Sequence, residues 1–110
     1  MHELSLTRNI VAAVDERARG RAVSNVTLRV GALSGVEVEA VRFCFDVCTE
    51  GTALEGATLT IVEVPARAEC QGCGKQVELE RLVAICPCEK RARMTLSSGD
   101  ELVIQSMEVR

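Results

Sequence analysis

The chain has 110 residues, the length of one small domain or of a domain that carries a smaller module. With 47% hydrophobic and 26% charged residues it has a globular composition, and no apolar run reaches the roughly 18–20 residues of a membrane-spanning helix. A net charge of −3, with two Phe as the only aromatic residues, argues against a nucleic-acid-binding domain, which needs basic and stacking side chains. Six Cys and a single His stand out against this background.

The first half of the chain opens with a predicted helix and a predicted strand. Residues 4–19 carry apolar side chains every three or four positions, which is typical of an amphipathic helix, and Gly20 is placed to end it. Residues 23–31 alternate between apolar and polar side chains, which predicts a half-buried strand. The apolar positions are Leu6, Ile10 and Val14 in the helix and Val26, Leu28 and Val30 in the strand.

A second helix and a second strand follow. We expect Ser34 to cap the helix at its start, with Glu37 completing a capping box, and the helix to run to about Thr49. Residues 57–64 are predicted to be a strand that Pro65 ends. The predicted inner faces consist of Val41, Phe45 and Cys48 in the helix and of Leu59, Ile61 and Val62 in the strand.

The rest of the chain divides into a cysteine-rich module, residues 66–98, and a final strand, residues 101–109. Leu102, Ile104, Ser106 and Glu108 alternate there with Val103, Gln105, Met107 and Val109. We expect this strand to return to the first sheet, so that residues 1–65 and 99–110 form one domain and the module is an insertion. The predicted fold is α+β, a small mixed domain of two helices packed on a three-stranded sheet, with an inserted zinc-ribbon-like module.

Two cysteine pairs in this module predict a metal site. Cys70 and Cys73 form a CxxC pair, and Cys86 and Cys88 follow after a spacer long enough for a small hairpin. Four thiolates suit a closed, structural Zn²⁺ site, which would also supply folding free energy that so short a segment lacks. The second pair is CxC rather than CxxC, so a site with a fourth non-Cys ligand, a damaged site and a redox pair remain alternatives.

The other two cysteines, Cys44 and Cys48, lie four residues apart and so on one face of the predicted second helix. That spacing can bind a metal. A reduced cysteine also behaves as a small hydrophobic side chain, and packing in the core is the preferred interpretation.

The start of the chain offers a different kind of donor set. The amine of Met1, the backbone nitrogen and imidazole of His2, and the backbone nitrogen of Glu3 can surround one ion in fused chelate rings. Ni²⁺ and Cu²⁺ favour nitrogen donors in one plane. The pattern is short, however, and every Met-His start shares it.

Several short segments occur in a recognisable order along the chain: Met1-His2-Glu3, the segment from Val30 to Glu37, Phe43-Cys44-Phe45-Asp46, Glu55-Gly56-Ala57, and the two cysteine pairs that follow Glu63-Val64. Together these features resemble the HypA/HybF family of nickel metallochaperones. The similarity covers essentially the whole chain in order. One departure is the Cys86-Pro87-Cys88 pair, which is one residue shorter than the family's C-P-x-C.

The resemblance implies a function and two metal sites. It implies Ni²⁺ binding by Met1, His2 and Glu3, structural Zn²⁺ binding by the four module cysteines, and delivery of nickel to the large subunit of [NiFe]-hydrogenase together with the GTPase HypB. It also implies a role toward urease in some bacteria. For Glu37 the resemblance suggests a supporting role beside the nickel ligands. The capping role described above is the preferred interpretation.

Two other functional classes stay open from the residues alone. A zinc-ribbon adaptor protein would bind a partner and have no nickel role, and a rubredoxin-like carrier would hold iron and be coloured. An enzyme is disfavoured, because no nucleophile–base pair is visible and His2 is the only histidine. We further expect a cytoplasmic protein, in which cysteines stay reduced, and a homodimer formed by strand or module exchange is conceivable.

Overall fold

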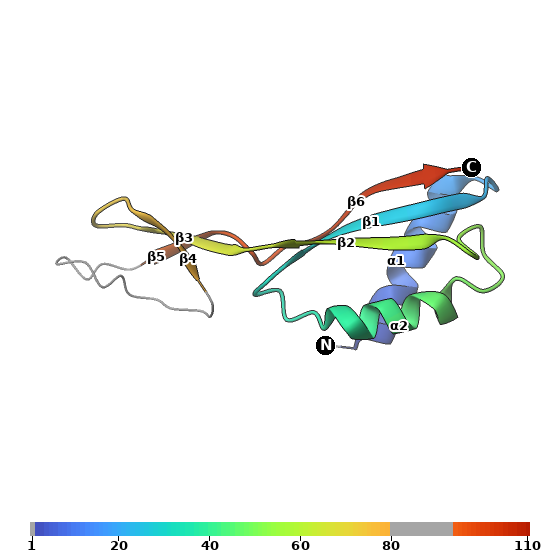
Figure 1. Ribbon diagram of the computed structural model, residues 1–110, viewed down its shortest axis with the longest axis horizontal. Coiled ribbons are helices and arrows are strands. Elements are labelled where there is room, and N and C mark those ends of the chain that lie inside the picture. The colour runs from blue at the N-terminus through green and yellow to red at the C-terminus, as the bar shows by residue number, and fades with distance from the viewer. Residues whose placement is uncertain (1, 80–93) are drawn as a thin grey trace. The chain divides into compact units, whose positions relative to one another are not determined.

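The structure, a computed structural model, describes residues 2–79 and 94–110 (Figure 1). The chain divides into two units. The first consists of Met1–Arg29, Val36–Val62 and Val103–Arg110, and the second of Val30–Gly35 and Glu63–Leu102. Among the described residues, no helix is long and apolar enough to cross a membrane.

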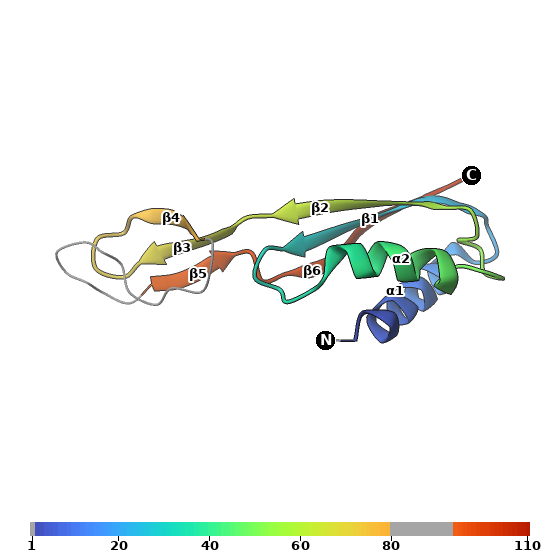
Figure 2. The ribbon, with the colours of Figure 1, turned by 60° about the horizontal axis from the view of Figure 1, so that its bottom comes forward.

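The first unit contains two helices and a three-stranded sheet in the order β2-β1-β6. The elements are α1 (Glu3–Ala18), β1 (Val23–Gly31), α2 (Val38–Cys48), β2 (Thr58–Val64) and β6 (Leu102–Val109), and the ends of the three strands extend into the second unit. β1 and β2 run in the same direction and are connected through α2, and both helices lie on one side of the sheet (Figure 2). This arrangement confirms the predicted fold class, including the return of the last strand to the first sheet.

The helix α1 forms where the apolar periodicity predicts it. Its buried residues lie on one face, and the helix ends through two consecutive residues with positive φ, Arg19 at 50° and Gly20 at 82°. Thr7 is fully buried, and its hydroxyl donates to the carbonyl of Glu3 at 2.7 Å, so this polar group is satisfied. The hydrophobic core of this unit consists of Ile10, Val11, Val14, Ala18, Val23, Val26, Leu28, Val41, Phe45 and Leu54.

The predicted capping box before α2 is wrong. The helix begins at Val38, its N-cap residue is Glu37, and no side chain caps it. Ser34 lies in a turn instead, where its amide donates to the carbonyl of Gly31 at 3.0 Å. Gly35 follows with φ at 79°, which takes the chain out of any helical path before Glu37.

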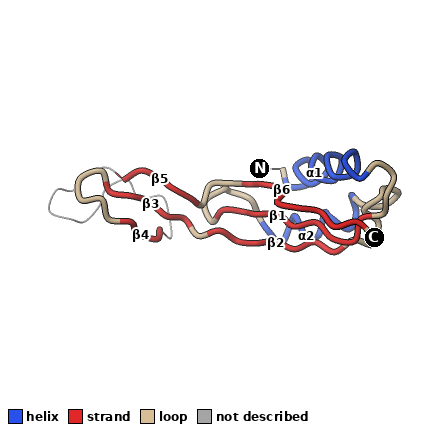
Figure 3. The backbone as a smooth tube through the Cα atoms, turned by 90° about the horizontal axis from the view of Figure 1, so that it is seen from above, coloured by secondary structure: helices blue, strands red, loops and turns tan. Residues whose placement is uncertain are grey.

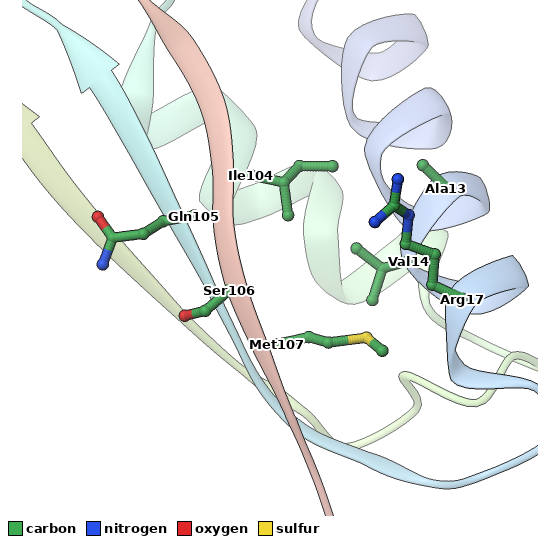
Figure 4. A pocket seen from close by; sticks show the side chains of 7 residues that line it. All are labelled: Ala13, Val14, Arg17, Ile104, Gln105, Ser106 and Met107. Atoms are coloured by element: carbon green, nitrogen blue, oxygen red, sulfur yellow. The ribbon is translucent and has the colours of Figure 1, made fainter.

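Two predicted strand faces also need correction. In β2 the half-buried residues are Leu59 and Ile61, whereas Val62 is 38% exposed. In β6 the alternation breaks, because Ile104 and Met107 both point toward α1 while the two residues between them point away (Figure 4). Two consecutive outward residues are typical of a β-bulge, which a pattern of strict alternation does not anticipate.

The second unit contains an antiparallel sheet in the order β4-β3-β5 (Figure 3). Its strands are β3 (Ala66–Cys70), β4 (Gln76–Leu79) and β5 (Met94–Ser98), and neither β3 nor β5 was predicted as a strand. Pro65 separates β2 from β3, as expected. Among described residues, the buried apolar side chains of this unit are small ones: Val30, Val64, Ala66, Ala68 and Cys70.

Close backbone contact fixes the part of this unit where β1 ends. The amide of Gly31 donates to the carbonyl of Glu101 at 2.7 Å, and the amide of Leu33 donates to the carbonyl of Gly99 at 2.7 Å. A Cβ atom at Gly31 would collide with the backbone carbonyl of Gly99, which cannot rotate away as a side chain could. Glycine is therefore required at this position for close approach rather than for a turn.

We predict that Gly31→Ala destabilises the fold by about 3 kcal/mol, because the backbone around Gly99 must shift to admit the methyl group. Gly35→Ala is the control. Gly35 has a positive φ but open space around it, and the strain there costs roughly 1–2 kcal/mol. Chemical denaturation of both variants measures the difference. A Gly31→Ala protein no less stable than the Gly35→Ala protein would contradict the close-contact account.

Candidate metal sites

The amino-terminal nitrogen donors lie just ahead of α1. His2 is exposed and is the N-cap of the helix, with extended backbone angles of φ −92° and ψ 94°. The amide of Leu6 donates to the carbonyl of His2 at 3.0 Å, which is the first bond of the helical ladder. The amides of His2 and Glu3 precede that bond, so neither has an acceptor within the helix. Met1 lies outside the described residues.

The side chain of Glu3 is held by the second helix. Its Oε2 accepts the backbone N–H of Glu37 at 3.2 Å. This amide belongs to the N-cap residue of α2 and has no acceptor within its own helix, so the carboxylate of Glu3 takes the place of a capping side chain. The donation lowers the pKa of the Glu3 carboxyl from its ordinary value of 4.5, with the backbone amide of Glu3 as the next contributor.

This contact separates two roles of Glu3. Its backbone nitrogen lies with that of His2 at the start of α1, whereas its carboxylate is directed to α2. Glu37 meets Glu3 through its main chain, a role that the sequence did not reveal because it depends on how two helices pack. The structure gives the side chain of Glu37 no capping hydrogen bond.

The first cysteine pair forms a tight turn between β3 and β4. The amides of Gly72 and Cys73 each donate to Cys70 Sγ at 3.4 Å. The amide of Cys70 donates to the carbonyl of Lys75 at 3.0 Å, which closes the loop. Backbone donors directed at sulfur favour its thiolate form, which is the form that binds metal. Cys70 is buried and Cys73 is exposed.

The other predicted zinc ligands, Cys86 and Cys88, lie outside the described residues. Within the ranges 2–79 and 94–110, no three His, Cys, Asp or Glu side chains gather as a metal site would require, and no cysteine there is part of a disulfide. The described pair therefore offers two of the four thiolates that the sequence predicts.

Cys44 and Cys48 lie half-buried on α2, beside the fully buried Val41 and Phe45. This position agrees with the interpretation of both as packing residues, although neither is completely enclosed. No described third ligand accompanies them.

A groove of about 340 Å³ opens between α1 and β6 (Figure 4). Val14, Ile104 and Met107 give it an apolar floor, and Arg17 adds a positive charge. The thioether of Met107 is its one soft donor, and the guanidinium of Arg17 repels a cation. The groove therefore suits an apolar group rather than a metal ion.

The bond between Glu3 and Glu37 gives a pH prediction. A lowered pKa in the folded chain means that the bond stabilises the fold above the ordinary pKa of 4.5 and that this contribution is lost as the pH falls through the lowered value. Glu37→Pro removes the donor and suits the φ of −84° at this position. We expect a carboxyl-resolved NMR titration to give a lowered pKa for Glu3 in the native chain and a higher one in Glu37→Pro. The same pKa in both proteins would contradict the assignment.

Comparison with known proteins places these features in context. The family model described as "Hydrogenase/urease nickel incorporation, metallochaperone, hypA" matches residues 1–109. A protein of Nostoc punctiforme named hydrogenase maturation factor HypA is 46% identical over 109 residues, which cover 99% of this chain and 96% of that protein. The protein of the same name from Geobacter metallireducens is 44% identical, and the match covers 99% of each chain.

Two solved structures share the fold. The solution structure of the Ni metallochaperone HypA from Helicobacter pylori has a TM-score of 0.67 at 22% identity, covering 99% of this chain and 97% of that one. A second solution structure, titled as that of HypA protein, has a TM-score of 0.72 at 23% identity and covers 100% and 97% of the two chains. At these identities the likeness bears on the arrangement of helices and strands alone.

Proposed function

This chain belongs to the HypA family of nickel-incorporating metallochaperones in hydrogenase maturation, and on that premise we propose that it captures Ni²⁺ through Met1, His2 and Glu3. The observation that carries the proposal is the start of α1 at Glu3. It leaves the amides of His2 and Glu3 outside the helical ladder, next to an exposed imidazole. Family membership disfavours the alternative of a zinc-ribbon adaptor without a nickel role.

The chemistry of capture follows from these nitrogens. Ni²⁺ displaces the protons of backbone amides when it binds them, and two ionised amides compensate its two positive charges. The positive end of the α1 macrodipole favours the negative charge that develops on these amides. Because protons compete with the metal, acidification weakens binding and offers a route to release.

The carboxylate of Glu3 has a positioning role in this proposal. It accepts the amide of Glu37 and so ties the first residue of α1 to the start of α2. Only the backbone nitrogen of Glu3 is then needed as a nickel donor. An ion held at a chain end by so few residues has little protein around it, which eases transfer to another protein.

We also propose that Cys70, Cys73, Cys86 and Cys88 hold one structural Zn²⁺. Two observations support this: amides directed at Cys70 Sγ suit a thiolate, and the described core of the second unit consists of small side chains. So little buried apolar surface stabilises a fold weakly, and a bound metal adds folding free energy. Residues 1–65 and 99–110 would then be the nickel-binding domain and residues 66–98 the zinc-binding module.

The partners proposed for this chain are a HypB-type GTPase and the large subunit of [NiFe]-hydrogenase, and urease maturation is proposed as a second client pathway. The protein acts without catalytic turnover, in the cytoplasm, where reduced cysteines keep the zinc site intact. A homodimer by exchange of β6 or of the zinc module is part of the proposal, since β6 resumes the first sheet after the second unit.

His2→Ala is expected to lose stoichiometric Ni²⁺ binding while the fold persists, because the exposed imidazole contributes nothing to the core. Equilibrium dialysis of the untagged protein measures this. Glu16→Ala, an exposed substitution on the same helix, is the control and should bind nickel normally. Unchanged nickel uptake by the His2→Ala protein would exclude the imidazole from the ligand set.

Cys73→Ser should remove the zinc and destabilise the chain by more than about 4 kcal/mol, a size typical of a lost structural metal. Cys44→Ser is the matched control, because Cys44 is half-buried on α2 and lies outside the proposed ligand set. Elemental analysis and thermal unfolding measure both effects. A Cys73→Ser protein with full zinc content and an unchanged Tm would show that the site is not structural.

A further inference from the structure

The outer face of α2 carries apolar side chains that the fold does not use. Phe43 is 76% exposed, whereas Phe45, the only other aromatic residue, is 2% exposed in the core. Val47 is 54% exposed and lies four residues after Phe43, so the two are neighbours on the helix surface. Single exposed apolar residues are common, but an adjacent Phe and Val form a continuous patch, and aromatic side chains are enriched in protein interfaces.

Carboxylates border this patch. Glu39 precedes Phe43 by four residues and Asp46 follows it by three, so both adjoin its ring on the helix surface. Glu50 lies just past the helix end, and all three acidic residues are exposed. Arg42, the one basic residue of α2, interacts with other residues of this chain. Its Nε lies 3.8 Å from Glu39 Oε1, and its Nη1 donates to the carbonyl of Leu59 at 3.4 Å.

We propose that this face, centred on Phe43 and Val47, is the docking surface for a second protein that presents an apolar pocket rimmed by lysine or arginine side chains. The carboxylates around the patch favour a basic partner over a second copy of this chain. A second copy of the chain in a symmetric dimer would bring Glu39 and Asp46 of both copies together, and like charges oppose such a contact. A basic rim instead complements the three carboxylates and accelerates association.

This surface lies close to the proposed nickel donors. The amide of Glu37, which holds the carboxylate of Glu3, lies six residues before Phe43, roughly 9 Å along the helix axis at 1.5 Å per residue. A protein seated on Phe43 is thereby close to the start of α1. The docking surface rests on the proposed function in this respect: its occupant is the protein that gives or receives nickel.

The experiment measures the affinity of the full-length chain for the purified GTPase and for the purified hydrogenase large subunit, the two partners proposed above. Phe43→Ala should weaken binding of at least one of them about 30-fold or more, as truncation of an interface hot spot does. Val47→Ala should weaken it several-fold. Val103→Ala is the matched control, because Val103 is 47% exposed on β6, and it should leave binding unchanged.

A double variant, Glu39→Gln with Asp46→Asn, should slow association at low salt and reduce its dependence on ionic strength. Circular dichroism and nickel uptake, measured on every variant, should match the native chain, since these side chains are exposed.

Unchanged affinity of the Phe43→Ala and Val47→Ala proteins for both partners would overturn the docking surface while leaving nickel capture intact. Self-association that Phe43→Ala abolishes would overturn it too, by assigning the face to a second copy. A native chain that takes up nickel but binds neither partner would refute the proposed partners and this surface together. Failure of nickel uptake itself would refute the proposed function separately.

Discussion

Helix α1 begins at Glu3, and its first hydrogen bond is donated by the amide of Leu6, so the amides of His2 and Glu3 are the first two of the four that have no acceptor within the helix. The carboxylate of Glu3 reinforces the arrangement by accepting the N-cap amide of α2. One residue thus connects the two helices by its side chain and contributes a nitrogen to the chain end by its backbone. The proposed nickel chemistry uses these two amides, which stand at the free end of the helical ladder.

The two units solve the problem of stability in different ways. The first packs α1 and α2 on one side of a sheet and encloses side chains as large as Phe45 and Leu28. The described part of the second encloses mainly Ala and Val, which contribute little apolar area. The turn at Cys70, with two amides directed at its sulfur, is where a metal would make up the difference. With the proposed zinc in place, a chain of this size would combine an ordinary core with a metal-dependent one.

Much of this architecture followed from periodicity. The apolar repeat of α1 and the alternation of β1 predicted both elements and their buried faces, because burial on one side leaves a regular pattern in the sequence. The start of α2 could not be predicted in this way, since the group that accepts its first amide is Glu3, 34 residues away. The break in β6 was not predicted either, because the sequence there reads as strict alternation, whereas Gln105 and Ser106 both point away from α1 (Figure 4). The burial of Phe45 rather than Phe43 could be predicted from the sequence. Residues two apart in a helix face different directions, so the two side chains could not both be buried equally.

In the proposed function, nickel is held by the nitrogen donors of the first three residues and not by the cysteines. X-ray absorption spectroscopy of the untagged protein loaded with one equivalent of Ni²⁺, its zinc retained, tests this most directly. We expect a planar nickel site with nitrogen neighbours, including an imidazole, and no sulfur. A nickel–sulfur scattering contribution would contradict this expectation, because it would place the cargo at the thiolates.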